Sequence, residues 1–496
     1  MRNEVLRLEK VTLRERGVTQ LDNLNLHIFE GEIMGLVPID THGLTALCDL
    51  LRENLPLHYG YVFYREKLIN TWRSPQPHYN RISVIQAKSC LVDGLSVADN
   101  IFVLRPGFRG RLMRPAAFRR QLMPFIHSIG IPIDADARVE DLSVFERFVV
   151  ELLKAVVAGS RLIVLNEIST LINQTELGKL HAILRHYAAE GISFLYICFH
   201  FEELLQICDR TALMMQGRVI KLLEGGEMIP QSLLPYSAAY EQMIASQLAR
   251  DTHQIGPEVF SACLPDAAVG GLHFSVRAGE CLVLQDLDNH FIDGFLGVLS
   301  GVRPPQGTRL LLRGRPLRPK PGRDRRLAVI QDQPGRTMIF PGLNYLENLC
   351  FTMDHRMKTL WLSGRVKRGL RRAYAEWLGP DLLDRRVDEL TETERCELVY
   401  RRILLQRPDV VFCVQPFRMA DVAMRMSIWR LLEELLDRGV AVVILAVNLA
   451  DSLSLADRLI RVRRGQPQEA FDRIHFNELP ADAPWRSLYR GIPSDQ

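Results

Sequence analysis

The sequence lacks most features that mark membrane-spanning, secreted or metal-binding proteins. No apolar run reaches the roughly 18 residues that a membrane-spanning helix needs, and the first ten residues lack the apolar core of a signal peptide. The nine cysteines occur singly, with no CxxC pair and no histidine at metal-ligand spacing. We interpret them as reduced, buried thiols and expect a cytosolic protein with no metal site.

The sequence also lacks a strong charge of either sign. A net charge of +4 on 496 residues is too small to indicate nucleic-acid binding. Two basic stretches, Arg313 to Arg326 and Arg365 to Arg372, fit a solvated arm better than a nucleic-acid surface. The hydrophobic content of 47% and the charged content of 24% are typical of globular material, and the length suffices for more than one domain.

What the sequence does have is an internal repeat with one constant offset. Gly31-Glu32 recurs 248 residues later as Gly279-Glu280, and Leu142-Ser143 recurs at the same offset as Leu390-Thr391. Asp209-Arg210 is likewise matched by Asp457-Arg458. So many short motifs would not share one sequence offset by chance, so we infer a tandem duplication.

Each half alternates short apolar runs with helical patterns. Leu162 to Leu165 and Val410 to Cys413 are examples of the runs, which are typical of buried strands in a parallel sheet. We therefore predict an α/β fold in two tandem domains, residues 1–245 and 250–496, each with a helical subdomain.

The most informative stretch of the first half is one loop. Gly31 to Leu47 has the frame of a phosphate-binding loop, in which glycines expose backbone amides and a lysine contacts phosphate. Here Pro38 takes the first glycine place, Gly43 keeps the second, Leu44 replaces the lysine and Thr45 keeps the hydroxyl. An ordinary strand–turn–helix is the plainer interpretation of this stretch alone.

Taken in order, the motifs give the chain a resemblance to the tandem ATP-binding-cassette subunits of bacterial sugar importers, the ribose and galactose type. Leu95 to Ile101 resembles the segment after the Q-loop, and Leu142-Ser143 resembles the start of the signature motif. Val164 to Glu167 resembles Walker B. The resemblance implies two P-loop NTPase-like cassette folds, with ATP-driven closure of the halves transmitted to membrane subunits.

Several first-half positions depart from that family's pattern. Asn166 replaces the Walker B aspartate, whereas Glu167 remains in the place of the general base as a catalytic remnant. Val144 and Phe145 replace signature glycines, and we expect them to fill part of the vacated nucleotide space. A degenerate nucleotide site would keep only three of the family's nucleotide-binding residues: Gly43, Thr45 and Gln86.

The second half departs further. Its loop, Asp286 to Asp293, has no glycine, carries Ile292 in the lysine place, and its carboxylates would repel a triphosphate. Walker B becomes Val414-Gln415. We therefore expect no cofactor, with ATP and Mg²⁺ bound only if the first site still accepts them.

These observations favour a pseudo-ATPase that acts by binding to a sugar-type ABC transporter. Two other functions stay open: an active ATPase that energises carbohydrate import, and a soluble regulator on the same scaffold. The expected partners are membrane permease subunits and an intact cassette subunit, with the chain peripheral at the inner face of the cell membrane. We expect apolar docking grooves near Gln86 to Ile101 and near Gln331 to Leu349.

Overall fold

A computed structural model describes most of the chain. The described residues are 3–15, 17–73, 82–86, 89–102, 115–233, 235–236, 253–265, 271–287, 289, 291–302, 306–318, 325–352, 364–378, 381–449, 451–463 and 468–479. The chain divides into two compact units, Met1–Ala238 and Ala239–Gln496. Each unit is described by itself below.

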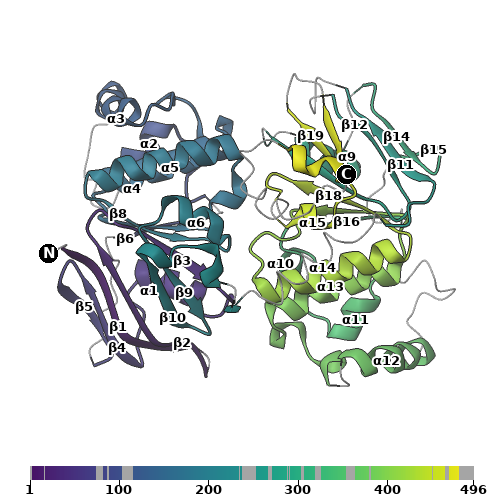
Figure 1. The fold of residues 1–496 in the computed structure, drawn as a ribbon, viewed down its shortest axis with the longest axis horizontal. Coiled ribbons are helices and arrows are strands. Elements are labelled where there is room, and N and C mark those ends of the chain that lie inside the picture. Colours follow the sequence, from purple (N-terminus) through teal and green to yellow (C-terminus); the bar gives the residue numbers. More distant parts are fainter. Residues whose placement is uncertain are drawn as a thin grey trace. The chain divides into compact units, whose positions relative to one another are not determined.

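The first unit is built on a six-stranded sheet (Figure 1). In spatial order its strands are β10 (Arg218–Glu224), β9 (Arg210–Met215), β3 (Ile33–Pro38), β8 (Ser193–Ile197), β7 (Leu162–Asn166) and β6 (Ile82–Gln86). All neighbours pair in parallel except β10, which is antiparallel to β9 at the edge. The central strands are apolar because both faces of the sheet are covered.

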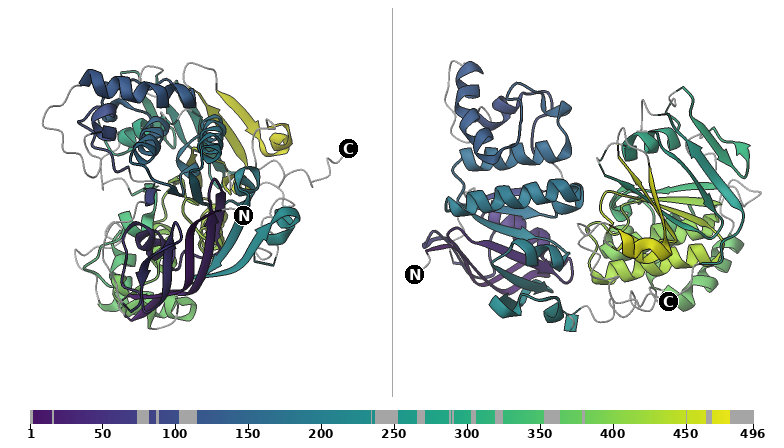
Figure 2. Two further views of the ribbon diagram at one scale, coloured as in Figure 1. Left: turned by 90° about the vertical axis from the view of Figure 1, so that its left-hand side faces the viewer. Right: turned by 45° about the horizontal axis from the view of Figure 1, so that its top comes forward.

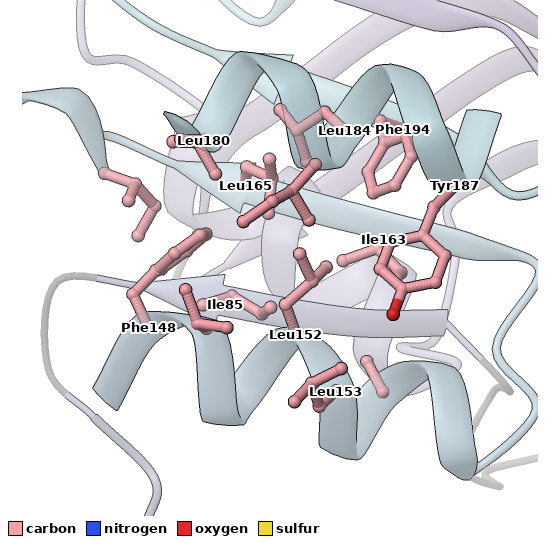
Figure 3. Close-up of a cluster of buried hydrophobic side chains, with 14 of the residues drawn as sticks. Ile85, Phe148, Leu152, Leu153, Ile163, Leu165, Leu180, Leu184, Tyr187 and Phe194 are labelled. Atoms are coloured by element: carbon pink, nitrogen blue, oxygen red, sulfur yellow. The ribbon is translucent and has the colours of Figure 1, made fainter. Parts of the chain in front are cut away.

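Alternate residues of β7 enter two separate cores. Ile163 and Leu165 pack against α4 (Val144–Val157) and α5 (Gln174–Ala189), whereas Leu162 and Val164 pack on the side of α1 (Leu44–Arg52). Figure 3 shows the first core, in which apolar side chains of both helices gather over the strands: Ile85, Phe148, Leu152, Leu153, Ile163, Leu165, Leu180, Leu184, Tyr187 and Phe194. This two-sided burial fixes the register of the strands, since a slip by one residue would exchange the two faces.

Two smaller parts complete the first unit. A four-stranded antiparallel sheet, dark purple in Figures 1 and 2, has the order β2 (Val18–Phe29), β1 (Glu4–Glu15), β4 (Tyr59–Tyr64), β5 (Lys67–Thr71). The predicted helical subdomain contains α2 (Val97–Phe102) and α3 (Pro115–Ile129), joined by stacked rings of Phe102 and Phe118 with centroids 5.3 Å apart. Among the described residues, no helix is long and apolar enough to cross a membrane.

The second unit repeats this plan. Its six-stranded sheet has the order β16 (Leu327–Ile330), β17 (Val410–Val414), β18 (Ala441–Ala446), β13 (Cys281–Asp286), β19 (Arg458–Val462), β20 (Glu469–Asp472). Its four-stranded sheet has the order β12 (His273–Arg277), β11 (Glu258–Cys263), β14 (Arg309–Leu312), β15 (Arg315–Pro316). The described helices of eight residues or more are α9 (Phe291–Leu299), α12 (Gly364–Leu378), α13 (Glu392–Gln406) and α14 (Val422–Asp437), and the shorter ones are α10 (Pro334–Thr337), α11 (Tyr345–Cys350) and α15 (Ser452–Leu455). The predicted α/β fold of two tandem copies is confirmed.

The repeat extends to individual polar contacts. Asp209 accepts a hydrogen bond from the Ile33 amide at 3.0 Å, and Asp457 accepts one from the Cys281 amide at 2.8 Å. Arg210 pairs with Glu32 at 2.6 Å, and Arg458 pairs with Glu280 at 2.9 Å. Every partner is displaced by 248 residues, so the sequence offset is also a structural one.

One ion cluster in the second unit has no counterpart among the described residues of the first. His253 Nδ1 lies 3.0 Å from Asp457, and its Nε2 lies 3.3 Å from Glu433. Burial disfavours the charged ring, but hydrogen bonds and charge from the two carboxylates outweigh it and raise the pKa of His253 to about 9. The charged ring therefore ties the start of the second unit to its sheet and to α14.

This cluster predicts alkaline destabilisation. The pKa of His253 is higher in the folded protein, about 9, than its ordinary value of 6.5 in the unfolded chain. The charged ring therefore stabilises the folded state fully below pH 6.5, and this stabilisation is lost as pH rises through about 9. The urea midpoint of the second unit should therefore fall between pH 7 and pH 10 by more in the native chain than in His253→Gln, which keeps a donor but does not titrate. Equal falls in the two proteins would show that the cluster contributes nothing.

Candidate nucleotide site

The predicted site residues lie at the carboxyl edge of the first sheet. Gln86 ends β6 and stands opposite Asn166 at the end of β7, and Asn166 in turn stands opposite Ile197 of β8. Gly43 is the left-handed N-cap of α1, with φ of 77°, and Thr45 is exposed in the first turn of that helix. The topology thus brings the predicted residues to one edge, where ligands of open α/β sheets bind.

The first loop is closed by contacts within the chain. The carboxylate of Asp40 accepts the amide of His42 at 3.1 Å and the amide of Gln216 at 2.9 Å. The ring of His42 reaches the Thr19 carbonyl at 2.7 Å, and a Cβ on Gly43 would come within 2.3 Å of the Gln20 carbonyl oxygen. The loop therefore packs against β2, and the amide of His42 is already hydrogen-bonded to the carboxylate of Asp40.

The residue in the lysine place points away from this edge. Leu44 is 6% exposed and belongs to the core beneath α1, together with Leu47 and Met34. An apolar side chain cannot contact phosphate, and this one is part of the packing that holds α1 on the sheet.

The second loop is closed more completely. A carboxyl oxygen of Asp286 accepts the amides of Phe291 and Ile292, at 2.8 and 3.2 Å. Asp286 is 2% exposed, and Ile292 occupies the place that corresponds to Leu44. The first amides of a helix are the donors that bind phosphate in a P-loop, and here they are bound to an acid of the chain.

The catalytic remnant, Glu167, is buried rather than directed to solvent. It is 1% exposed, has φ of 58°, and accepts the amide of Phe199 at 2.9 Å. Gln415, the counterpart of Glu167, also has positive φ, 43°, so both units keep the backbone turn while only the first keeps an acid.

Both signature helices carry a capping box. The hydroxyl of Ser143 accepts the Glu146 amide at 3.2 Å while Glu146 accepts the Ser143 amide at 2.9 Å. Thr391 and Glu394 make the same pair of bonds at 3.2 and 2.7 Å. Each box places a carboxylate at the positive end of its helix, where a phosphate from elsewhere would otherwise be attracted.

The expectation for Phe145 needs correction. Phe145 is 5% exposed and lies in the core of the first unit with Phe148 and Val149. It therefore packs into the core of its own unit instead of filling vacated nucleotide space. Val144, 40% exposed, is the apolar side chain that stays outside.

Comparison with known proteins finds relatives of ABC type. A protein-family profile described as ABC transporter matches residues 21–170. A putative ribose/galactose/methyl galactoside import ATP-binding protein of Hahella chejuensis is 24% identical over 493 residues, covering 96% of this chain and 94% of the relative. A protein of the same description from Agrobacterium fabrum is 25% identical over 481 residues, covering 95% and 96%.

By these comparisons the chain is similar to ABC-type proteins, and its second unit repeats the fold of the first. It resembles the tandem import ATP-binding proteins over nearly its whole length, including a ribose import ATP-binding protein of Rubrobacter xylanophilus, 24% identical with 96% and 97% covered. A crystal structure of an ATP-binding cassette of an ABC transporter in its ADP conformation aligns with a TM-score of 0.42 and 17% identity, covering 49% of this chain and 98% of that one.

The residues of the two loops do not fit a Mg²⁺-bound triphosphate. In the second unit Asp286 takes the helix amides, and in the first Leu44 is buried and Asp40 binds a loop amide. Among the described residues, no group of three or more His, Cys, Asp or Glu side chains could hold a metal ion.

Of the two expected docking grooves, the second coincides with a cavity of about 430 Å³, lined within the predicted stretch by Gln331, Thr337, Met338 and Phe340. Val97, Ala98 and Ile101 of α2 are buried, as are Tyr345 and its neighbours on α11, so these stretches are helix core. Large exposed apolar side chains remain beside them: Val92 at 46% in the first unit, and Phe340 at 36% and Phe351 at 49% in the second. Sequence patterning could not separate these cases, because short helices of a small subdomain are apolar on several sides.

Proposed function

We propose that this chain is a cassette subunit of a sugar-type ABC transporter that acts by binding its partners rather than by hydrolysing ATP. It would lie in the cytoplasm, peripheral to the inner face of the membrane, and bind the permease subunits. The observation that carries the proposal is Asp286, whose carboxyl group takes the amides that would bind phosphate in the second unit.

A transporter role is supported by the names of the relatives, which are import ATP-binding proteins matched along nearly their whole length. Those names favour the second candidate, an active ATPase that energises carbohydrate import, more than the first. The geometry of the two loops supports the first. ATP and Mg²⁺ enter this account only if the first unit, through Gly43, Thr45 and Gln86, still accepts them.

The docking part of the proposal is tested with Val92, which follows β6 in chain order and is 46% exposed. A charge there should oppose burial against a membrane subunit, so Val92→Glu should lower co-purification with the permease at least tenfold. Ile229→Glu is the matched control, since Ile229 lies in the same unit and is 45% exposed.

Both variants should keep the circular dichroism spectrum and urea midpoint of the native chain, because neither side chain is buried. Equal co-purification of Val92→Glu and Ile229→Glu would exclude Val92 from the docking surface. A native chain that captures no membrane subunit would favour the soluble regulator.

A further inference from the structure

The helix α12 of the second unit presents a basic face to solvent. Five of its 15 residues are lysine or arginine, and its one acid, Glu376, lies near its carboxyl end. Among its described side chains Arg368, Arg371 and Arg372 are exposed. Their spacing of three and four residues places these arginines on one side of the helix.

The opposite side of α12 attaches the helix to its unit. Leu370 and Tyr374 are half-buried and pack against a core cluster that includes Tyr345 and Leu349 of α11. In Figure 1 α12 lies at the periphery of the unit, with α11 beside it. Since the apolar side chains hold the helix in place, the arginines on its outer side are available to a partner outside the chain.

Contacts within the chain balance little of this positive charge. Arg371 pairs with Asp384, and both side chains are about half exposed, at 49% and 58%. Arg368 donates to the Gly364 carbonyl of its own helix at 3.2 Å. Among the described residues neither Arg368 nor Arg372 forms an ion pair. An exposed ion pair is weak, so Arg371 can exchange Asp384 for another anion.

The equivalent helix of the first unit, α3, lacks this face. At the offset of 248 residues its inward positions are Leu122 and Ile126, which are apolar and buried like the inward side of α12. On its outer side Met123 and Pro124 stand in the places of the two adjacent arginines, and only Arg120 keeps a basic side chain. Packing therefore requires the apolar side in both units, whereas the triple-arginine face belongs to the second.

Three arginines spaced along the outside of a helix suit a surface that carries many phosphates. A guanidinium group can bind a phosphate through two parallel hydrogen bonds. Each basic residue near an anionic membrane surface strengthens binding about fivefold. Single-stranded nucleic acid also carries phosphates, but it binds largely by stacking on aromatic rings, and Tyr374 of α12 is half-buried against its own unit.

We propose that the outer face of α12 binds a bilayer surface of anionic phospholipid headgroups through Arg368, Arg371 and Arg372. This inference goes beyond the proposed function, because the lipid contact needs no permease subunit. It agrees with the position proposed for the chain at the inner face of the membrane. Failure of the lipid contact would leave the permease contact, which Val92→Glu tests, unaffected.

The test is co-sedimentation of the full chain with vesicles of equimolar phosphatidylglycerol and phosphatidylcholine. The native chain should bind these mixed vesicles at least about tenfold more tightly than pure phosphatidylcholine vesicles, and added salt should weaken the binding. Replacing Arg368, Arg371 and Arg372 together by glutamine should weaken it at least about tenfold. Glutamine is a good helix former, so the circular dichroism spectrum should not change.

A matched control separates this face from the net charge of the chain. Arg277, Arg309 and Arg315 are exposed on the four-stranded sheet of the same unit, so replacing all three by glutamine removes the same charge elsewhere. This control should bind the mixed vesicles as tightly as the native chain.

The proposal is overturned if the native chain does not prefer the mixed vesicles, or if the α12 variant binds them as well as the native chain. It is equally overturned if the control loses as much binding as the α12 variant. Binding of single-stranded RNA through the three α12 arginines, with no binding of the mixed vesicles, would assign this face to nucleic acid instead.

Discussion

Purified protein supplied with ATP and Mg²⁺ is expected to release phosphate no faster than protein-free buffer. Phosphoryl transfer depends on positioned positive charge and metal, and Leu44 and Ile292 supply neither. The remaining acid, Glu167, is held by the Phe199 amide at 2.9 Å. The expected rate is at least about a thousandfold below that of an ordinary enzyme, which turns over on the order of 10 times per second.

Two variants sharpen this expectation. Leu44→Lys alone should not restore hydrolysis, because Asn166 and the capped signature helices stay as they are. Turnover by the native chain that disappears in Glu167→Gln would establish the active-ATPase alternative and refute the binding-only proposal.

Replacing Asp286 by alanine is expected to destabilise the second unit by about 2 kcal/mol, the upper part of the range for loss of a helix cap. The reason is that two buried amides, those of Phe291 and Ile292, lose their acceptor, and Asp286 is too deeply buried for water to replace it easily. Urea unfolding measures the change as a lower midpoint with an unchanged slope.

Asp286→Asn is the matched control, because its side-chain oxygen can still accept both amides. It should retain at least half of the stability that alanine loses. If the two variants are equally stable, the carboxyl group does not hold the loop, and the amides are available to another acceptor.

Much of the fold could be predicted because repetition is visible in sequence without knowledge of structure. The constant offset that links Gly31 to Gly279 also links Asp209 to Asp457. Each aspartate accepts a hydrogen bond from the first amide of the corresponding strand, β3 or β13. Short apolar runs indicated a parallel sheet because each strand is covered on both faces.

The site was predicted less completely because the decisive contacts depend on which way side chains turn. The sequence shows acids in the second loop, and repulsion of a triphosphate follows from that. It does not show that Asp286 turns back onto the helix amides five and six residues later. Phe145 was misjudged because helical periodicity does not reveal which neighbour faces a buried position.

The central claim is that both loops are closed by acids of the chain itself, Asp40 in the first unit and Asp286 in the second. Equilibrium binding of labelled ATP, with Mg²⁺, to the full chain tests it most directly. The account predicts no saturable binding up to about 1 mM, a concentration that corresponds to a binding free energy of about 4 kcal/mol. Saturable binding at micromolar ATP, displaced by unlabelled ATP and lost when Gly43 is replaced by alanine, would contradict it.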